Sequence, residues 1–587
     1  MTVEKLITDN IDVWSSALQT RSTAGRGSNS KIDLYGIKKL RELILELAVR
    51  GKLVPQDPND EPASELLKRI AAEKAELIKQ GKIKKQKPLP EISEDEKPFE
   101  LPEGWEWVRL GDLGVIGSSS RVHQRDWKPN GIPFYRAREI VTLAKYGEVN
   151  NDLFISSELF ESLCLNGLSP EANDIMLTGV GTIGIPYIVK SYDKFYFKDA
   201  SVLIFKNIHS IYSEYLNKIF TSKYWKDEIH KYSMGTTVHT LTISRANEVL
   251  IPFASEQDQV GLVSKIDELM LLCDQLEQQS LTSLDAHQQL VETLLATLTD
   301  SQNAEELAEN WERISLHFDT LFTTEASIDA LKQTILQLAV MGKLVPQDPN
   351  DEPASELLKR IEQEKVQLVK DGKIKKQKPL PPVNDEEKPF ELPTGWEWCR
   401  LASLFSIITD GDHQAPPKAS NGVPFLVIGN LNKGEVSLED SKFVPKEYFD
   451  NLDWSKKPTK NDMLYTVTGS YGIPIIVKEN CAFCVQRHVA ILKSCLNTPN
   501  LYLKNVFLTP YAYDLATNIA TGIAQKTVPL TGLRVMCIPL PPANEIARIM
   551  EKLQTLDVLF LGLKSRLQSA QQTQLHLANA LTDAALN

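Results

Sequence analysis

The sequence predicts an α+β protein with two similar β-rich domains separated by long antiparallel coiled-coil helices, in a pseudo-two-fold, circular organisation. A repeat is the first observation behind this fold class, because residues 49–110 and 340–401 agree at 48 of 62 positions without a gap. A block of short β-type runs follows each copy, and a heptad-like pattern follows each block. Most of the repeated residues are polar, and packing alone rarely requires the same polar residues twice. The two copies are therefore expected to present the same surface.

The composition is that of a soluble globular protein, with 42% hydrophobic and 24% charged residues. A chain of 587 residues is too long for one core, so about three to five domains are expected. No run reaches about 18 apolar residues and the N-terminus lacks an apolar signal core, so we expect a cytoplasmic protein without a membrane span. Seven scattered cysteines fit a reducing compartment. The net charge of −12 does not exclude DNA as a partner, because a local basic face is sufficient.

Each copy of the repeat contains two predicted helices. The first, over residues 31–50, carries Ile37, Leu40, Ile44 and Leu47 on one face, with Gly51 as its C-terminal cap. The second copy repeats this pattern with Ile328, Leu331, Ile335, Leu338 and Gly342. A second helix starts at ASELLKRI in each copy, with Ser64 and Ser355 as the predicted N-caps.

Each second helix leads into the basic segment GKIKKQKPLP, which is identical at 81–90 and 372–381. Its lysines have two interpretations, a solvated linker or an arm that contacts DNA phosphates. The duplication supports the second interpretation without excluding the first.

The β-rich blocks span residues 105–252 and 396–539. DIMLTGVGTIGIPYIVK at 174–190 parallels DMLYTVTGSYGIPIIVK at 462–478, which predicts two domains of one fold with diverged loops. At the exits, VLIPFASEQ parallels VMCIPLPPANE, with Asn544-Glu545 in place of Glu256-Gln257.

A long helix of about 40 residues, or about 60 Å at 1.5 Å per residue, is predicted after each block. Its apolar residues are spaced four and three apart, as in a coiled-coil seam. The seam residues are Leu262, Ile266, Leu269, Cys273 and Leu276 in the first helix, and Ile549, Leu553, Leu556, Phe560, Leu563 and Leu567 in the second.

The sequence offers no catalytic or metal-binding set. GVGTIG at 179–184 matches the dinucleotide fingerprint, but a strand pattern follows it where a helix is required, so we predict a tight turn. The chain lacks GxxxxGK[ST] and the Asn/Asp-Pro-Pro-aromatic tetrapeptide of adenine methyltransferases. Cys481 and Cys484 form a lone CxxC without the second pair that a zinc site needs. We therefore expect no catalytic residue, no metal and no cofactor in this chain.

Polar and basic loops of the two blocks are the best candidate site. Arginine reads guanine through two hydrogen bonds, glutamine and asparagine read adenine, and serine, threonine and lysine contact phosphate. Taken singly, each position is better explained as an ordinary surface residue, and only the set at matching places in two divergent domains favours a DNA-binding site. The DNA-binding candidates of the first block are Arg121, Gln124, Arg125, Arg136, Arg138, Thr182, Thr237, His239 and Arg245. Those of the second block are His413, Gln414, Lys418, Tyr471, Gln486, Arg487, His488, Gln525 and Lys526.

Over nearly its whole length the chain resembles the specificity (S) subunit of a Type I restriction-modification system. The resemblance rests on the duplicated GKLVPQDPNDEPASELLKRI, on LP-x-GWEW before each block, and on the VLIP-x₃-EQ and IPLPP-x-NE exits into the long helices. It implies two target recognition domains, at 105–256 and 396–543, each reading one half of an asymmetric bipartite site in double-stranded DNA. The N-terminal (1–104), central (257–395) and C-terminal (544–587) regions would form the helical framework that sets the spacer.

The resemblance also implies the partners. Two modification subunits would dock on the framework and methylate adenine with S-adenosylmethionine, and two restriction subunits would supply translocation and cleavage with ATP and Mg²⁺. The candidate docking residues lie on the long helices and are Ile266, Leu269, Leu276, Leu553, Leu556 and Phe560.

Two other functions remain open from sequence alone. A self-contained methyltransferase or nuclease would transfer methyl groups or cut DNA without partners. A coiled-coil scaffold would bind DNA with no sequence preference.

Overall fold

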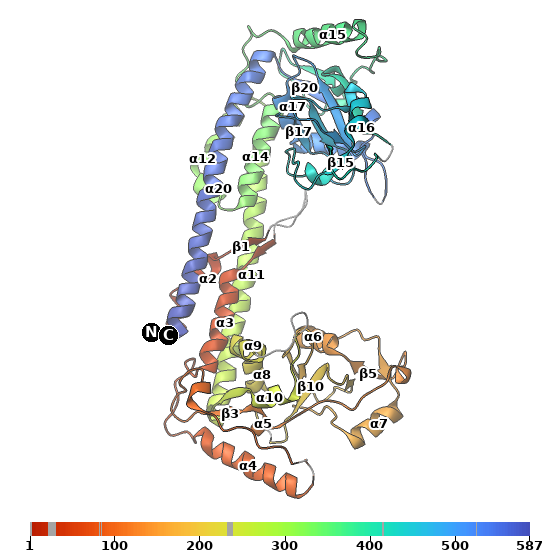
Figure 1. The fold of residues 1–587 in the computed structure, drawn as a ribbon. Coiled ribbons are helices and arrows are strands. Elements are labelled where there is room, and N and C mark those ends of the chain that lie inside the picture. The colour runs from red at the N-terminus through yellow and green to blue at the C-terminus, as the bar shows by residue number, and fades with distance from the viewer. Residues whose placement is uncertain are drawn as a thin grey trace. The chain divides into compact units, whose positions relative to one another are not determined.

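The computed structural model describes residues 3–21, 31–81, 83, 85–209, 211–231, 239–413, 416–523 and 525–586 (Figure 1). The chain divides into two compact units, one of residues 1–19, 32–281 and 571–587 and one of residues 20–31 and 282–570. Each unit contains one copy of the repeat, one β-rich domain and part of both long helices. The predicted α+β class, with two similar domains and long helices, is confirmed.

The two β-rich domains have the same topology, although their loops differ. In the first, a four-stranded sheet has the order β4 (Val115–Gly117), β10 (Val202–Lys206), β7 (Ile175–Thr178), β8 (Pro186–Ile188). In the second, the equivalent order is β13 (Phe405–Asp410), β19 (Val489–Ser494), β16 (Met463–Thr466), β17 (Pro474–Ile476). The prediction of one fold used twice is therefore confirmed.

A three-stranded group is also shared. It has the order β6 (Phe154–Ile155), β5 (Ile132–Tyr135), β9 (Tyr196–Phe197) in the first domain. In the second domain the order is β15 (Lys442–Val444), β14 (Val423–Leu426), β18 (Cys484–Val485). In both groups one pair is antiparallel and the other parallel.

The first and last strands of each block pair with each other. In the first block β3 (Glu106–Arg109) is antiparallel to β11 (Leu250–Phe253), and in the second β12 (Glu397–Arg400) is antiparallel to β20 (Cys537–Leu540). The long helices follow at once, as α11 (Glu256–Asp300) and α20 (Ala543–Leu586), and have 45 and 44 residues. Each block therefore leaves the framework and returns to it at one place.

A tryptophan of each GWEW motif anchors the start of a long helix. The Trp105 indole Nε1–H donates to Asp258 Oδ2 and that of Trp396 to Glu545 Oε2, both at 2.9 Å. Glu545 therefore corresponds to Asp258, and the alignment of Asn544-Glu545 with Glu256-Gln257 was wrong by one residue. The carboxylate that the indole requires is kept in both copies.

A buried arginine joins each repeat to its block. Arg400 Nε donates to Pro381 O at 3.0 Å, and its Nη atoms donate to Pro382 O at 2.6 Å, Val535 O at 2.7 Å and the Glu387 carboxylate. Arg109 makes the equivalent bonds to Pro90 O, Glu91 O, Glu248 O and Glu96. Each guanidinium thus holds the basic segment, the first strand and the last helix of the block together.

The first helix of each repeat ends as predicted. α3 (Tyr35–Val49) buries all four predicted apolar residues, and α14 (Glu325–Val340) buries their counterparts. Gly51 and Gly342 follow with φ of +66° and +71°, and a Cβ on either would lie within about 2.5 Å of a proline ring. Glycine is therefore required there for both conformation and space.

The second helix of each repeat starts two residues earlier than the predicted N-caps imply. α4 (Ala63–Lys79) and α15 (Ala354–Lys370) have Pro62 and Pro353 at the N-cap, so the prediction of Ser64 and Ser355 as N-caps was wrong. The first helical N–H groups donate instead to Gly104 O and Gly395 O, both at 2.8 Å. A backbone carbonyl from the GWEW turn thus replaces a side-chain cap.

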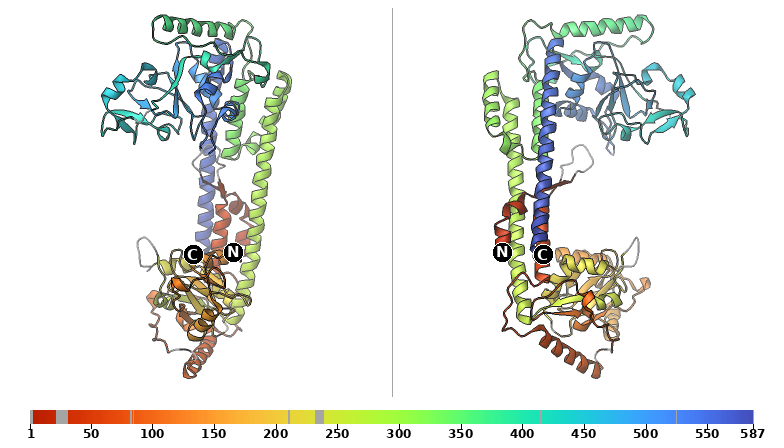
Figure 2. Two further views of the ribbon diagram at one scale, coloured as in Figure 1. Left: turned by 90° about the vertical axis from the view of Figure 1, so that its right-hand side faces the viewer. Right: turned by 60° about the vertical axis from the view of Figure 1, so that its left-hand side comes forward.

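α4 and α15 each lie against the β-rich domain of their own unit (Figure 2). Lys74 Nζ donates to Gly111 O at 2.8 Å, and Lys365 Nζ donates to Ala402 O at 2.9 Å. Burial lowers the pKa of both lysines. The same lysine therefore fixes the repeated helix to its domain in both units.

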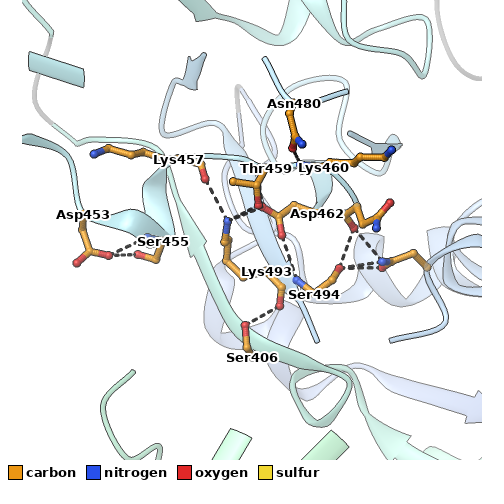
Figure 3. A network of polar contacts seen from close by, with 12 residues as sticks. Ser406, Asp453, Ser455, Lys457, Thr459, Lys460, Asp462, Asn480, Lys493 and Ser494 are labelled. Atoms are coloured by element: carbon orange, nitrogen blue, oxygen red, sulfur yellow. Dashed lines mark hydrogen bonds and ion pairs between the residues drawn. The ribbon is translucent and has the colours of Figure 1, made fainter. Parts of the chain in front are cut away.

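A lysine on the four-stranded sheet of each domain pairs with a buried aspartate, and Figure 3 shows the pair of the second domain. Lys493 Nζ on β19 bonds Asp462 Oδ2, and Asp462 accepts from the backbone N of Thr459 at 2.7 Å. In the first domain Lys206 Nζ bonds Asp174 Oδ2 at 2.7 Å. The pair fixes the loop before β16 or β7 to the neighbouring strand, so loops elsewhere are able to differ without loss of the sheet.

We predict that Arg400→Ala destabilises the second unit by about 3 kcal/mol. Three backbone carbonyls lose their donor, and each costs about 1 kcal/mol. Urea denaturation of the purified protein measures the loss, and Arg109→Ala should cause a loss of similar size in the first unit. An unchanged urea midpoint for Arg400→Ala would contradict the role of this contact.

The Arg400–Glu387 contact should also make stability depend on pH. Hydrogen bonds from Arg400 and from the Asn384 backbone lower the pKa of Glu387 from 4.5 to about 2. Because folding favours the ionised form, this stabilisation is present above pH 4.5 and is lost as the pH falls toward about 2. The difference in urea midpoint between the wild type and Glu387→Gln should therefore shrink across that range, whereas Glu386→Gln serves as a matched control. A difference that stays constant down to the lowest pH would contradict the assignment.

Candidate nucleic-acid interface

The glycine-rich turn of the first block connects two antiparallel strands, β7 and β8, and no helix begins there. Gly181 and Gly184 have φ of +81° and +74°. Thr178 Oγ1 fixes the turn by accepting from Ile185 N at 2.9 Å, and Thr466 Oγ1 does the same for Ile473 N at 3.0 Å. The prediction of a tight turn is confirmed, and it places Thr182 on the surface.

A distant segment meets this turn in each domain. Gly181 N donates to His239 O at 3.1 Å in the first, and Gly469 N donates to Lys526 O at 3.0 Å in the second. The side chains of His239, Gln525 and Lys526 are exposed. In the first domain the structure therefore places Thr182 next to His239. In the second domain it places Gln525 and Lys526 next to the equivalent turn. In both domains the two segments that meet are more than 50 residues apart in the sequence.

In the second domain, two more candidate segments meet. Asp412 and Gln486 form a parallel bridge, and a Cβ on Gly411 would lie 1.9 Å from Val485 O, so only glycine fits. Gln486 Nε2 lies 3.0 Å from His488 Nδ1, and Val467 N donates to His488 O at 3.0 Å. Burial and then the nearby Arg487 lower the pKa of His488, which favours its neutral form. His413, Gln486, Arg487 and His488 thus adjoin the turn that meets Gln525 and Lys526.

The first domain has the corresponding arrangement. Arg121, Gln124 and Arg125 are exposed in the loop after β4, which is tied by Ser120 N to the Tyr196 hydroxyl at 3.0 Å. Ala200 N donates to Ser118 Oγ at 3.2 Å, which joins the loop after β9 to the same region.

Other candidates lie elsewhere or are already bonded. Arg136 and Arg138 both bind Glu139 and Asp152. Burial would raise the pKa of Glu139, but the hydrogen bonds from the two arginines outweigh it and lower that pKa. Both guanidinium groups are therefore neutralised by carboxylates in this structure.

Three further candidates occupy separate positions. Arg245 is half-buried in α10 (Ile243–Glu248), and Lys418 is exposed beside Ala419, which bridges to β15. Tyr471 is only 7% exposed, and its ring stacks on Tyr513 with centroids 5.6 Å apart. Tyr471 is therefore packed inside the domain, although its selection as a DNA-binding candidate assumed a position on the surface. Thr237 and Gln414 lie outside the described residues.

Sequence reasoning missed three surface positions. Lys198 follows β9 where Gln486 follows β18, and Ser470 occupies the position of Thr182 in the second turn. Ile523 lies fully exposed in the loop that contains Gln525, where an apolar side chain can contact a thymine methyl group. Alignment of the strands, which the structure supplies, is the signal that identifies the first two.

The candidate docking residues of the long helices are packed inside the chain. Ile266, Leu269, Leu276, Leu553 and Phe560 are each at most 8% exposed, and Leu556 is partly buried against the same core as Leu553 and Phe560. In unit two, Lys332 Nζ on α14 bonds Asp557 Oδ1 on α20 at 2.6 Å, beside this core. These side chains stabilise helix packing, so any docking surface on the helices is formed by other residues.

Among the described residues, no three His, Cys, Asp or Glu side chains are arranged to hold a metal ion. The same part of the chain contains no helix of the length and hydropathy that a membrane span requires.

We predict that Tyr471→Phe leaves DNA recognition unchanged and costs about 1 kcal/mol of stability, because only the hydrogen bond to Thr517 is lost. Gln525→Ala, at an exposed position of the adjoining loop, should weaken sequence-specific binding without a change in stability. Binding assays with duplex DNA and urea denaturation of both variants measure the two effects. A loss of recognition in Tyr471→Phe alone would contradict this placement.

The sequence of the chain matches known proteins over all or part of its length. A family model described as the Type I restriction modification DNA specificity domain matches residues 102–286. The chain is 48% identical over 608 residues to the Type I restriction enzyme EcoAI specificity subunit of Escherichia coli, and 48% identical over 624 residues to the EcoEI specificity subunit of the same species. Both alignments cover 100% of each chain.

A solved structure, the HsdS subunit from Thermoanaerobacter tengcongensis, matches 84% of this chain and 98% of its own, with 17% identity and a TM-score of 0.35. The assignment therefore rests on sequence identity over the full length. The chain belongs to the specificity subunits of Type I restriction enzymes.

Proposed function

We propose that this chain is the DNA-recognition and scaffold subunit of a Type I restriction-modification complex, and that each β-rich domain reads one half of an asymmetric bipartite DNA site. The observation that carries the proposal is one sheet topology used twice with different loop residues at equivalent places. A shared framework keeps the reading surface in place, while the loops change its chemistry.

The candidate side chains support different readings by the two domains. The first domain presents Arg121, Thr182 and His239, and the second presents Gln486, Arg487 and Gln525. Bidentate contacts from arginine to guanine or from glutamine to adenine discriminate by about 1–3 kcal/mol each. Different side chains on the reading surfaces of the two domains are suited to different half-sites.

The repeat supports two copies of one partner. The loops before α4 and α15 are both exposed, and both form the same turn. In this turn Asn59 N donates to Asp57 Oδ1 in the first copy, and Asn350 N donates to Asp348 Oδ1 in the second, both at 2.9 Å. Arg69–Glu61 and Arg360–Glu352 form the same ion pair next to it. Two modification subunits docked on these surfaces, with the restriction subunits added to them, would complete the complex.

The chemistry is then carried by the partner subunits. S-adenosylmethionine would bind the modification subunits, and ATP and Mg²⁺ the restriction subunits. The absence from the sequence of the phosphate-binding loop and of the methyltransferase tetrapeptide supports a non-catalytic role for this chain.

Methylation mapping in cells that express this chain with its modification subunit tests the proposal. We expect methylated adenines in a motif of two unlike specific parts separated by an unspecified spacer. A continuous motif, or methylation by this chain without a partner, would contradict the proposal.

Replacing residues 106–253 with the equivalent block of another family member should change one half of the motif only. The strand pair β3–β11 is carried with the block, so the framework is preserved. Methylation mapping of the hybrid measures the outcome, and a change in both halves would show that the domains do not read independently.

A further inference from the structure

A cleft of about 850 Å³ lies between the second basic segment and the β-rich domain of the same unit. Residues 372–380 form one wall. Ile407 and Ile408 of β13, η6 (Trp454–Lys456) and α19 (Leu530–Val535) contribute to the other.

The cleft is strongly basic although the chain carries a net charge of −12. Five cationic side chains and one carboxylate, Asp453, line it; the cations are Lys373, Lys375, Lys376, Lys378 and Arg534. The four lysines are exposed, and within the described residues none of them pairs with a carboxylate. Asp453 accepts from Ser455 N at 2.9 Å and from Ser455 Oγ at 2.6 Å. Its charge is therefore partly satisfied already, and the lysines are left for an external anion.

The basic wall is held in place rather than left as a free linker. Trp454 Nε1 donates to Lys373 O at 2.8 Å, and Gln377 Nε2 donates to Ser406 O at 2.7 Å. Trp454 is itself fixed by Lys493 Nζ, which lies 5.2 Å from its ring centroid. Arg400 Nε holds the end of the segment through Pro381 O. A cationic segment fixed before binding loses less entropy when it binds an anion.

The cleft is continuous with the candidate base-reading surface. β13 runs from the cleft residue Ile408 to Asp410 and leads directly into Gly411–His413. From the same wall, Lys456 Nζ of η6 reaches Asp412 Oδ1 at 3.3 Å. A duplex bound at the loops would therefore have its backbone close to the lysines.

We propose that this cleft binds the phosphate backbone of the DNA beside the half-site read by the second domain. The inference rests on the proposed function and adds a sequence-independent part to it. Lysine contacts to phosphate position the duplex and contribute affinity, while the loops contribute specificity.

The first unit lacks one component of the cleft. Asn247 occupies the position of Arg534, as the register of β11 and β20 shows, and its Nδ2 donates to Ile243 O of its own helix at 2.8 Å. Lys82 and Lys84 of the first basic segment lie outside the described residues. The proposal is therefore made for the second unit alone.

The test uses the complex of this chain with its modification subunit and two duplexes, one with the mapped methylation motif and one with that motif scrambled. The variant Lys375→Gln/Lys376→Gln/Lys378→Gln should make the slope of log affinity against log salt shallower by about 2 to 3, since each phosphate contact contributes about 0.9. Affinity at 0.1 M salt should fall about 100- to 1,000-fold for both duplexes, with the methylated motif unchanged. Replacing the same three lysines with arginine should keep the wild-type slope.

A matched control removes the same charge elsewhere on the repeat. The control variant replaces three exposed lysines outside the cleft, as Lys359→Gln/Lys370→Gln/Lys388→Gln. Its slope of log affinity against log salt should stay close to that of the wild type. An unchanged slope in the cleft variant, an equal change in the control, or a loss confined to the motif duplex would overturn the proposal. Loss of the modification subunit from the cleft variant on size-exclusion chromatography would also overturn it and identify a protein-docking surface.

Failure of the proposed function is distinguishable from these outcomes. In that case the wild-type complex itself would bind the two duplexes equally, whatever the lysine variants do.

Discussion

The rest of the structure depends on one constraint: the chain enters and leaves each β-rich block at the same place, where the first and last strands of the block lie side by side. The first and last strands of a block pair with each other, and a buried arginine bonds the carbonyls on both sides of this junction. One step later, an indole N–H bonds a carboxylate in the first turn of the long helix. Because these contacts lie in the framework, residues inside the block are able to change without moving the helix that follows.

The same arrangement explains which residues stay constant between the two copies. The guanidinium groups of Arg109 and Arg400 and the indoles of Trp105 and Trp396 are buried at the junction, where a lost partner costs free energy. The carboxylates that the two indoles bond, Asp258 and Glu545, are buried there as well. The loops that meet at the β7–β8 and β16–β17 turns carry no such requirement, because their backbone bonds hold them whatever side chains they present. A protein whose two domains recognise different half-sites needs constant residues at the junctions and different residues at the turns.

Much of this organisation follows from the sequence, because a repeat, a 4-3 spacing and strand-like runs are local patterns. The long helices, the turn at 179–184 and the glycines after the first helices were all predicted from such patterns. The N-caps of α4 and α15 were not, because the group that satisfies the helix N–H is a carbonyl 41 residues further along the chain.

The candidate site was predicted less completely for the same reason. Thr182 and His239 become neighbours only through a bridge between separate segments. Tyr471, in the turn between β16 and β17, is removed from the surface by stacking on Tyr513 of α18 (Pro510–Ile519). Apolar seam residues were assigned to partner docking, yet the helices of the chain itself cover them. Periodicity identifies an apolar face but does not say whether the chain or a partner covers it.

Independent reading by two domains on one framework is the central claim, and one chimera tests it most directly. A chain in which residues 397–540 are replaced by residues 106–253 keeps both junctions but carries the first block twice. Methylation mapping of this chimera with the modification subunit should give a motif whose two specific parts form an inverted repeat, the same base sequence read on opposite strands, with the wild-type spacer length. A motif that retains the second wild-type part would contradict the account.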